Sequence, residues 1–462
     1  MELHLEMPET GSRRRLQELH RQLKAAIIDG RLTEGLRLPT SRELSASLGV
    51  SRNTVVSAYD LLLSEGYIEA RGRAGTYVAR MHRDPPGRTR APRARPAPVA
   101  ATPPEAPVRY DFRVGEPDQS LFPFDTWRRL SARALREFQR KPVLAAALEG
   151  ERALREAIAG HVSFARAVAC TADDVIVTAG AKHAFALLTQ ALVLPQGLPV
   201  ALEDPGYHQL ERILAHHGVC PAKVPVDAHG LVVDRLPPRT RAIFVTPSHQ
   251  FPLGLVMSLA RRLELLDFAR RNDCLVVEDD YDAEFRYGGR PLDALQTLDR
   301  HGRVFYVGTF SKSLFPALRT GYIVAPSWAR QRILDMVDGG GASVPLLTQS
   351  TLAAFIREGH LARHVRKMRS VYAERREAML TALHQHGRGL LEPIGSEAGL
   401  HVCVRLASSR APAVLAEAAR QAGIALERNH APGTLLLGLG GTTALSTTAG
   451  IKALCAVLRK MA

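Results

Sequence analysis

One lysine amine that could do covalent chemistry stands directly after a short apolar run. The chain of 462 residues has only eight lysines, and Lys312 lies in the segment Gly308-Thr-Phe-Ser-Lys-Ser-Leu-Phe-Pro-Ala-Leu-Arg-Thr-Gly321. The apolar residues 304–307 before it predict a buried strand. Ligands of α/β domains sit at the carboxyl ends of such strands, where a lysine amine can condense with an aldehyde.

Two neighbours of Lys312 suit a phosphate group. Thr309 offers a hydroxyl and Arg319 a guanidinium, which binds phosphate oxygens in pairs. An aldehyde and a phosphate on one small molecule describe pyridoxal 5'-phosphate, so we predict this cofactor as a Schiff base on Lys312. Taken alone, the segment is equally compatible with a surface lysine on a turn.

A carboxylate follows a second apolar run. Residues 275–277 precede the segment Glu278-Asp-Asp-Tyr-Asp-Ala-Glu-Phe-Arg286. Pyridoxal phosphate withdraws electrons best when its ring nitrogen is protonated, and a nearby carboxylate keeps it so. We therefore assign Asp279 to the ring nitrogen and Tyr281 to the phenolic oxygen. The alternative is a divalent-metal cluster of the three aspartates, but no histidine spacing nearby supports it, and no metal is predicted.

Two further segments complete the predicted cofactor site. In Thr178-Ala-Gly-Ala-Lys-His-Ala184, the backbone N–H groups of Ala181 and Lys182 would open a helix and cradle the phosphate. In Asp204-Pro-Gly-Tyr207, the ring of Tyr207 would stack on the pyridine ring. The alternative for Tyr207 is a turn aromatic that covers the core.

The elements around these residues alternate between apolar runs and helical segments. The apolar runs are 175–177, 199–202, 242–245, 275–277, 304–307 and 322–324, and the helical segments include 184–194, 259–271 and 291–298. Such alternation predicts an α/β domain with a mainly parallel or mixed sheet. Helical periodicity over 346–385, followed by mixed elements, predicts a smaller C-terminal lobe.

The first 80 residues follow a different pattern. Apolar residues at helical spacing and turn glycines predict three helices, and two short strand-like runs follow between 67 and 79. Thr40 with Glu43 matches a capping box, and Ser51 can cap the third helix. This order of elements predicts a winged helix-turn-helix.

The third helix would present Ser51-Arg52-Asn53-Thr54, the turn that reaches base edges in a helix-turn-helix. Arg52 could pair with guanine and Asn53 with adenine, whereas Ser51 and Thr54 suit phosphate. Further DNA contacts are predicted at Arg42, Arg71 and Arg73. The alternative is a basic surface that is used for protein contacts.

A stretch dominated by proline, arginine and alanine separates the two patterns. It cannot bury a core and predicts a semi-extended tether. We therefore predict a DNA-binding domain at 1–80, a linker at 81–108 and a second domain at 109–462.

The composition limits the partners and the cellular location that the protein can have. The net charge of +15 and the pI near 10.0 fit a polyanionic partner, although the basic excess is spread along the chain. No apolar run is long enough to cross a membrane, and the N-terminus lacks the apolar stretch of a secretory signal. The five cysteines form no Cys-x-x-Cys pair, so a reducing cytoplasm is the predicted location.

Two resemblances carry these predictions further. The head segments Leu23-Lys-Ala-Ala-Ile-Ile-Asp-Gly-Arg-Leu32, Gly35-Leu-Arg-Leu-Pro-Thr-Ser-Arg-Glu-Leu44 and Leu48-Gly-Val-Ser-Arg-Asn-Thr-Val55 resemble the winged helix of GntR-type bacterial transcription regulators. The segments spread over 110–462 resemble the class I aminotransferase fold, the fold type I of pyridoxal phosphate enzymes. A winged head, a tether and an aminotransferase-like body in this order resemble the MocR/GabR family.

The resemblance implies operator DNA as a partner and a head-to-tail homodimer, in which one subunit's head lies over the other's body. It also implies that the loop Ser248-His-Gln-Phe-Pro-Leu-Gly254 supplies a group to the ring oxygen of the cofactor, with His249 or Gln250 as the candidate.

Three departures from the family pattern bear on function. Leu436 stands where aminotransferases usually have an arginine that clamps a substrate carboxylate, and Gln209 stands where members that bind γ-aminobutyrate have an arginine. Lys182 replaces the usual glutamine near the phosphate loop. The first two departures argue against an ordinary amino-acid transaminase and against γ-aminobutyrate as effector.

We therefore predict a transcription regulator that binds DNA and pyridoxal phosphate and senses an amine, or the cofactor itself, through Lys312, without physiological turnover. The alternative is an active aminotransferase with a secondary DNA-binding head. A third hypothesis, a regulator whose body has lost the cofactor, is disfavoured because Lys312, Asp279 and Arg319 are intact.

Overall fold

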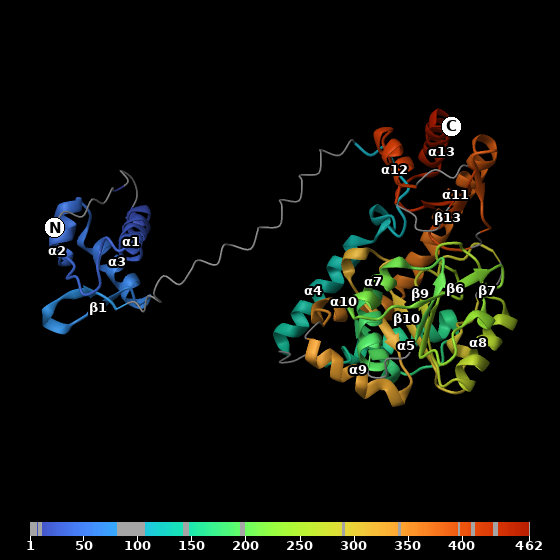
Figure 1. The fold of residues 1–462 in the computed structure, drawn as a ribbon, viewed down its shortest axis with the longest axis horizontal. Coiled ribbons are helices and arrows are strands. Elements are labelled where there is room, and N and C mark those ends of the chain that lie inside the picture. Colours follow the sequence, from blue (N-terminus) through green and yellow to red (C-terminus); the bar gives the residue numbers. More distant parts are fainter. Residues whose placement is uncertain are drawn as a thin grey trace. The chain divides into compact units, whose positions relative to one another are not determined.

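The computed structural model describes residue 7 and residues 12–80, 107–141, 147–194, 199–288, 292–340, 343–395, 398–407, 412–427 and 433–461. The chain divides into two compact units, Met1–Pro103 and Pro104–Ala462, which we call the head and the body (Figure 1). The predicted linker 81–108 lies outside the described residues except for its last two. None of the helices described is both long and apolar enough to span a membrane.

The head consists of three helices and a hairpin. They are α1 (Ser12–Ile28), α2 (Ser41–Leu48), α3 (Arg52–Ser64) and the antiparallel strands β1 (Ile68–Ala70) and β2 (Thr76–Val78). Each element contributes to one buried core, with Leu23, Leu44, Leu62, Ile68 and Val78 among its members. The predicted winged helix-turn-helix is confirmed.

Local signals fix where α2 and α3 begin. The Thr40 hydroxyl accepts from the Glu43 N–H at 3.3 Å, and the Glu43 carboxylate accepts from the Thr40 N–H at 2.8 Å, so the capping box forms. Gly49 ends α2 with a φ of 62°, a left-handed conformation that favours glycine. Ser51 then caps α3 by accepting from the Thr54 N–H at 3.1 Å. These caps set the position of the first turn of α3.

An eight-stranded mixed sheet forms the centre of the body, in the order β4-β11-β10-β9-β8-β5-β6-β7. The strands are β4 (Val175–Thr178), β5 (Val200–Asp204), β6 (Ala222–Asp227), β7 (Gly230–Leu231), β8 (Ala242–Val245), β9 (Leu275–Asp280), β10 (Val304–Thr309) and β11 (Gly321–Val324). Strands β5, β6, β8, β9 and β10 run parallel, whereas β11 is antiparallel to both of its neighbours. The carboxyl ends of the parallel strands therefore meet at one edge of the sheet.

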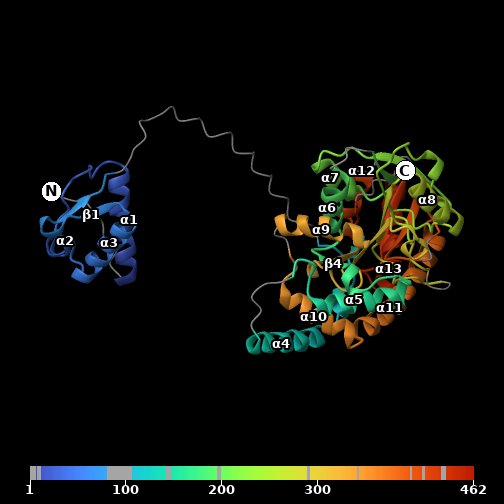
Figure 2. The ribbon, with the colours of Figure 1, turned by 90° about the horizontal axis from the view of Figure 1, so that it is seen from below.

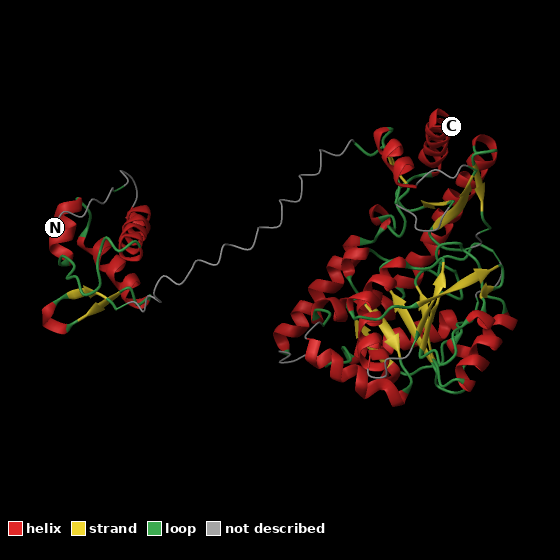
Figure 3. Cartoon of the chain, in the orientation of Figure 1, coloured by secondary structure: helices red, strands yellow, loops and turns green. Residues whose placement is uncertain are grey.

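Helices cover both faces of the sheet (Figures 2 and 3). One face carries α6 (Ala181–Leu188), α7 (His208–His216) and α9 (Ser327–Gly340), and the other carries α5 (Arg152–Arg166), α8 (Leu259–Arg271) and α10 (Leu346–Arg357). Because side chains alternate along a strand, Ala201 and Leu202 belong to different cores. A π-helical turn, Thr189–Val193, extends α6, and α4 (Phe124–Arg140) packs beside α10.

The helix predicted over 291–298 is wrong for the part that the structure describes, 292–298. Only Gln296–Leu298 forms a short 3-10 turn. The Glu278 carboxylate accepts from the backbone N–H groups of Leu295 and Gln296 at 2.8 and 2.9 Å. A buried side chain thus takes the donors that a helix would use.

A smaller C-terminal lobe forms as predicted. Its elements are α11 (His360–His386), β12 (Leu391–Pro393), β13 (His401–Leu406), α12 (Pro412–Gln421), β14 (Ile424–Ala425), β15 (Thr434–Gly438) and α13 (Ala444–Met461). Strands β12, β13 and β15 form one antiparallel sheet that shares a core with α11 and α13. The first strand of the body, β3 (Tyr110–Asp111), pairs with β14, so the start of the body belongs to this lobe.

Ser51→Ala should loosen the start of α3, because the Thr54 N–H loses its side-chain acceptor and keeps only the Ser51 carbonyl, at a cost of about 1 kcal/mol. Amide hydrogen exchange in peptides covering 52–64, measured by mass spectrometry, should become several-fold faster, with no change in the body. Ser64→Ala is the matched control, because the Ser64 hydroxyl donates to the Leu61 carbonyl and caps no N–H. Equal exchange in wild type and Ser51→Ala would contradict the capping role.

Candidate functional site

A cavity of about 340 Å³ opens at the carboxyl ends of the central strands. Its walls come from the residues after β5, β9 and β10, from the start of α6 and from the segment 114–116. The predicted cofactor residues on these walls are Ala181, Lys182, Tyr207, Asp279, Tyr281, Thr309, Lys312 and Arg319. The structure thus brings together the predicted residues other than His249 and Gln250.

The Lys312 amine lies inside this cavity, where Nζ donates to the Gly115 carbonyl at 2.8 Å. Burial lowers the pKa of Lys312, while the charges of Asp282 and Glu116 act in the opposite direction. A lowered pKa favours the neutral amine, the form that attacks a carbonyl. A Cβ at position 115 would lie 2.2 Å from Nζ, so glycine permits this approach. No pattern in the sequence pointed to Gly115.

The Asp279 carboxylate borders the same cavity. Its Oδ1 atom is buried and has no hydrogen-bond partner among the residues that the structure describes. Burial, and then the charge of Asp280, raises the pKa of Asp279 well above its usual range. Leaving a buried acceptor unpaired is costly. A protonated pyridine nitrogen would supply the missing donor, so Asp279 fits the group predicted for this site.

One end of the cavity is suited to an anion. Helix α6 begins after Gly180, whose φ of 86° favours glycine, and no side chain caps its first turn. Arg319 lines the same cavity as Gly180, Ala181 and Lys182 at this helix start. Burial, and then the charge of Arg319, lowers the pKa of His183 in the first turn of the helix. Uncapped N–H groups beside a guanidinium fit a phosphate.

Tyr207 borders the cavity at the start of α7. Its ring packs edge-on against Phe251, with 5.7 Å between the ring centroids, and also touches the core under α6 and α7. Burial raises the pKa of the Tyr207 hydroxyl. Tyr207 therefore covers part of the core and also faces the space in which a pyridine ring would lie.

His249 and Gln250 lie behind the cavity and point in different directions. The Nδ1 atom of His249 lies 2.8 Å from the Tyr281 hydroxyl oxygen and 2.9 Å from Asp282 Oδ1. The Gln250 amide instead donates to the Pro205 carbonyl at 2.8 Å and to Glu203 at 3.3 Å. Of the two candidates, only His249 connects to the predicted cofactor residues, and it does so through Tyr281.

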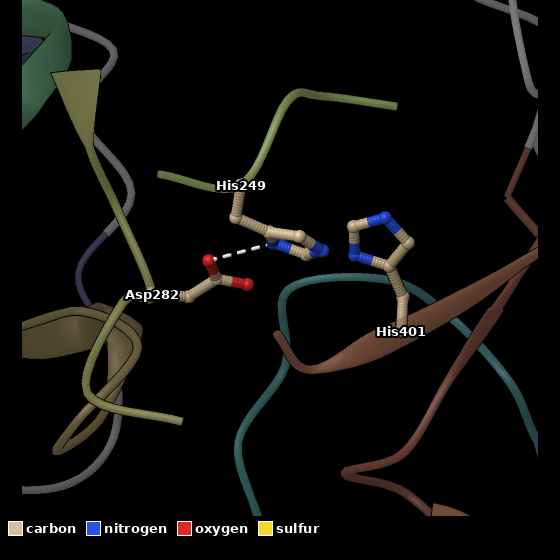
Figure 4. Close-up of side chains that lie close together, drawn as sticks. All are labelled: His249, Asp282 and His401. Carbon is tan, nitrogen blue, oxygen red and sulfur yellow. Dashed lines mark hydrogen bonds and ion pairs between the residues drawn. The ribbon is translucent and has the colours of Figure 1, made fainter. Parts of the chain in front are cut away.

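Three buried side chains, His249, Asp282 and His401, lie close together (Figure 4), with their nearest polar atoms within 4.8 Å. Their polar atoms are largely committed to hydrogen bonds, which include those of Asp282 Oδ2 to the Leu400 N–H and of His401 Nε2 to the Pro252 carbonyl. We therefore describe a hydrogen-bonded cluster. Sequence reasoning missed His401 and considered Asp282 only as a ligand of the alternative metal cluster, because neither role is visible without the long-range contacts.

The aspartate cluster that was the alternative at 279–282 is divided between separate roles. Asp280 forms a buried ion pair with Arg166 at 2.7 Å and accepts from the Tyr306 hydroxyl at 2.6 Å. Asp279 faces the cavity, and Asp282 bonds to His249. The prediction that no metal binds here stays a prediction.

The two departures from the aminotransferase pattern occupy different places. Leu436 is buried in β15 opposite Cys403 and is not among the described residues that line the cavity. Gln209 lines the cavity, and its amide lies 3.0 Å from the His208 ring nitrogen.

In the head, the first turn of α3 presents Arg52 and Asn53 to solvent. The hydroxyls of Ser51 and Thr54 bond to each other at 2.8 Å, and Thr54 is only 9% exposed, so both are used within the helix start. The Arg52 Nε atom donates to the Ser41 hydroxyl at 3.4 Å. Arg52 and Asn53 are thus the residues of this turn that are free to reach bases.

The other predicted DNA contacts lie beside that turn. Arg42 is exposed in the first turn of α2. Arg71 bonds to Glu69 at 2.7 Å and lies 4.7 Å from the centre of the Tyr77 ring. The Arg73 side chain lies outside the part that the structure describes.

Two protein families match nearly the whole chain. Residues 16–78 match the gntR family of bacterial regulatory proteins, and residues 111–458 match aminotransferase class I and II. The chain therefore belongs to the class of proteins that join a GntR winged helix to an aminotransferase-type body. Proteins with a GntR helix-turn-helix bind operator DNA.

Relatives narrow this class. A Rhizobium meliloti protein described as the probable rhizopine catabolism regulatory protein MocR is 39% identical over 419 residues, 88% of this chain and 85% of that protein. The pyridoxine biosynthesis transcriptional regulator PdxR of Corynebacterium glutamicum is 36% identical over 389 residues, 83% and 82% of the two chains. This chain is thus an HTH-type transcriptional regulator of the MocR type, and the main prediction is supported over that of an enzyme with a secondary head.

Solved structures agree on the fold of the body. The α-aminoadipate aminotransferase LysN of Thermus thermophilus, complexed with N-(5'-phosphopyridoxyl)-L-leucine, has a TM-score of 0.69 at 26% identity over 76% of this chain and 92% of its own. The kynurenine aminotransferase of Pyrococcus horikoshii has a TM-score of 0.69 at 23% identity, over 77% and 92% of the two chains. The predicted aminotransferase fold is confirmed.

Arg52→Ala should weaken discrimination between operator bases, because an arginine that pairs with guanine contributes about 1–3 kcal/mol of preference. Arg52→Lys is the matched control, since it keeps the charge but loses the paired donors. Affinities for a set of single-base operator variants should be measured at fixed salt. For Arg52→Ala, the four bases at one operator position should bind with nearly equal affinity. An unchanged base preference would contradict the placement of α3 in the groove.

Glu203, at the end of β5, is a second buried carboxyl near the cavity. Its Oε2 atom accepts from the Thr246 hydroxyl at 2.6 Å, and its Oε1 atom has no partner within the described ranges. Burial raises the pKa of Glu203 to about 7. The folded body therefore keeps a proton that the unfolded chain releases above pH 4.5, so stability falls as the pH rises from 4.5 to about 7.

Glu203→Gln should remove this loss of stability in protein prepared without added cofactor. Relative to wild type, the variant should gain up to about 3 kcal/mol in unfolding free energy above pH 7, and the gain should shrink toward pH 4.5. Urea unfolding can be followed by the fluorescence of Trp127 and Trp328, the two tryptophans of the chain. The exposed Glu392 provides the control Glu392→Gln, and a pH-independent difference for Glu203→Gln would contradict the raised pKa.

Proposed function

We propose that this regulator binds pyridoxal phosphate in the body cavity and that events at Lys312 control how it binds operator DNA. One observation supports the proposal most directly. A half-buried amine with a lowered pKa and an unpaired buried carboxylate oxygen, Asp279 Oδ1, face one cavity that has an uncapped helix start at its edge.

Each residue has a defined part in holding the cofactor. Lys312 would bind the aldehyde carbon, Asp279 would keep a proton on the ring nitrogen, and Tyr207 would lie against the ring. The Ala181 and Lys182 N–H groups, with Thr309 and Arg319, would bind the phosphate. When bound, pyridoxal phosphate supplies a carbon that amines attack and a ring that withdraws electrons.

The sensed signal in this proposal is an amine that competes for the cofactor, or the presence of the cofactor itself. Such a ligand can shift the DNA-binding equilibrium only by its difference in affinity between two arrangements of the protein, and operator DNA must change the affinity for that ligand by the same factor. We further propose a head-to-tail homodimer that binds operator DNA through Arg42, Ser51, Arg52, Asn53, Thr54, Arg71 and Arg73.

Lys312→Ala should abolish the visible absorption that appears when the protein is soaked in pyridoxal phosphate, because that band needs a covalent link to an amine. The cofactor should also add no mass to the variant after borohydride reduction, and circular dichroism should show a folded protein. Lys223→Ala, a surface lysine paired with Glu211 at 2.8 Å, is the matched control and should keep the band. Retention of the band in Lys312→Ala would place the link elsewhere.

The same preparations test the link to DNA. Operator affinity should differ between wild type with cofactor, wild type without it and Lys312→Ala, and a panel of amines should change the affinity of the loaded wild type alone. Identical operator affinity in all of these states would contradict the proposal that the body controls DNA binding.

A further inference from the structure

Next to Tyr281, the buried side chains of His249 and Asp282 form a chain of hydrogen bonds, and Asp282 also borders the cavity. The Tyr281 hydroxyl lies 2.8 Å from His249 Nδ1, and the same nitrogen lies 2.9 Å from Asp282 Oδ1 (Figure 4 shows the second contact). The side chains of His249 and Asp282 are 1% and 2% exposed. One imidazole nitrogen is therefore shared between a phenol and a carboxyl group, out of contact with water.

The surrounding hydrogen bonds assign the proton on His249. Asp282 Oδ2 accepts from the Leu400 N–H at 3.1 Å, which orients the carboxylate so that Oδ1 faces His249. A carboxylate only accepts hydrogen bonds, so His249 Nδ1 must carry a proton and donate it. The Nε2 atom of His249 has no partner among the described residues, so nothing there competes for this assignment.

This tautomer determines what Tyr281 can do. Because Nδ1 is a donor, the Tyr281 oxygen can only accept from it, and the phenolic proton remains available to another acceptor. Tyr281 lines the cavity, so that acceptor lies on the cavity side. Burial, and then the charge of Asp282, raises the pKa of Tyr281 well above its usual range, so the hydroxyl keeps its proton.

Packing holds the imidazole in this position. Gly399 has a φ of 85°, and a Cβ there would lie 1.9 Å from His249 Cε1, so the loop before β13 closes over the ring. The His401 ring also lies 5.1 Å from that of His249 between centroids and is itself bonded to the Pro252 carbonyl at 3.2 Å. The ring of His249 therefore has little room to turn.

We propose that His249 and Asp282 are positioning residues that fix Tyr281 as a hydrogen-bond donor to the phenolic oxygen of the bound cofactor. This proposal rests on the proposed function. With the cofactor bound, a donor would stabilise negative charge on that oxygen and lower the proton affinity of the nitrogen that joins Lys312 to the cofactor. His249 and Asp282 would thus set the pH at which that nitrogen loses its proton, by fixing the direction of the Tyr281 hydroxyl.

Asp282→Asn tests this assignment because it reverses the donor. The Leu400 N–H requires an oxygen, so the new amide would turn its N–H toward His249, and Nδ1 would become an acceptor. An aspartate-to-asparagine change in the Ser-His-Asp triad enforces the wrong tautomer in the same way. A bare Nδ1 competes for the Tyr281 proton and draws it away from the cavity.

The measurement is a pH titration of the visible absorption of the cofactor-loaded protein. His249→Phe and Tyr281→Phe should each move the midpoint upward by roughly one pH unit, a tenfold gain in proton affinity for the loss of one hydrogen bond. Asp282→Asn should shift it upward by less, because this variant also removes a negative charge that favours the protonated nitrogen. The double variant His249→Phe with Tyr281→Phe should shift no further than Tyr281→Phe alone, because His249 acts through Tyr281.

Two further variants separate positioning from loosened packing. The amide nitrogen of His249→Asn reaches the place of Nδ1. The midpoint of this variant should therefore lie closer to wild type than that of His249→Phe, by at least half of the shift. Tyr287→Phe removes a 2.7 Å hydrogen bond to the Gly399 carbonyl in the same region without touching Tyr281, and should leave the midpoint in place. The other charged groups that line the cavity, Glu116, Asp279, Lys182, Arg319 and Glu427, are unchanged in every variant.

The outcomes are distinct. A wild type that gains no visible band overturns the proposed function. If the wild type titrates normally and His249→Phe leaves the midpoint unshifted, the inference is overturned and the proposed function stands. If Asp282→Asn does not fold, the comparison of His249→Phe with His249→Asn decides, and equal midpoints for those two variants overturn the inference.

Discussion

The body is organised around the burial of ionisable groups at one edge of its sheet. An amine and a carboxylate that are withdrawn from water lose hydration, and their burial is tolerable only if another polar group replaces the lost water contacts. Lys312 uses the Gly115 carbonyl for this purpose, whereas Asp279 has an oxygen that no described residue satisfies. The cost of that arrangement is the physical basis of our proposal that a positively charged heterocycle binds in the cavity.

The strand-end residues could be predicted because their signals are local. An apolar run followed by Asp279 or by Lys312 marks a buried strand and the edge at which it ends, and parallel strands bring those edges together. The capping residues Thr40 and Ser51 of the head were equally visible, because a cap is defined by its own few neighbours. Such local signals were enough to predict the folds of the head and the body and most of the residues that line the cavity.

The remaining parts depend on contacts that no local pattern encodes. Gly115 and His401 enter the site only when loops from distant parts of the chain close over it, and the role of Asp282 depends on its bond to the distant His249. The helix expected over 291–298 failed for a related reason, because the buried carboxylate of Glu278 takes its backbone donors. Long-range side-chain contacts override periodicity in these places.

The hydrogen bond between Lys312 and Gly115 also connects the site to the start of the body. Gly115 belongs to residues 107–141, the first stretch of the body that the structure describes, which is anchored through β3 to β14 and through Asp118 to Arg375. When the Lys312 amine bonds to another group, that stretch loses its hydrogen bond to Lys312. Since the polypeptide from the head enters the body through these residues, a change of bonding at one nitrogen alters how firmly the incoming strand is held.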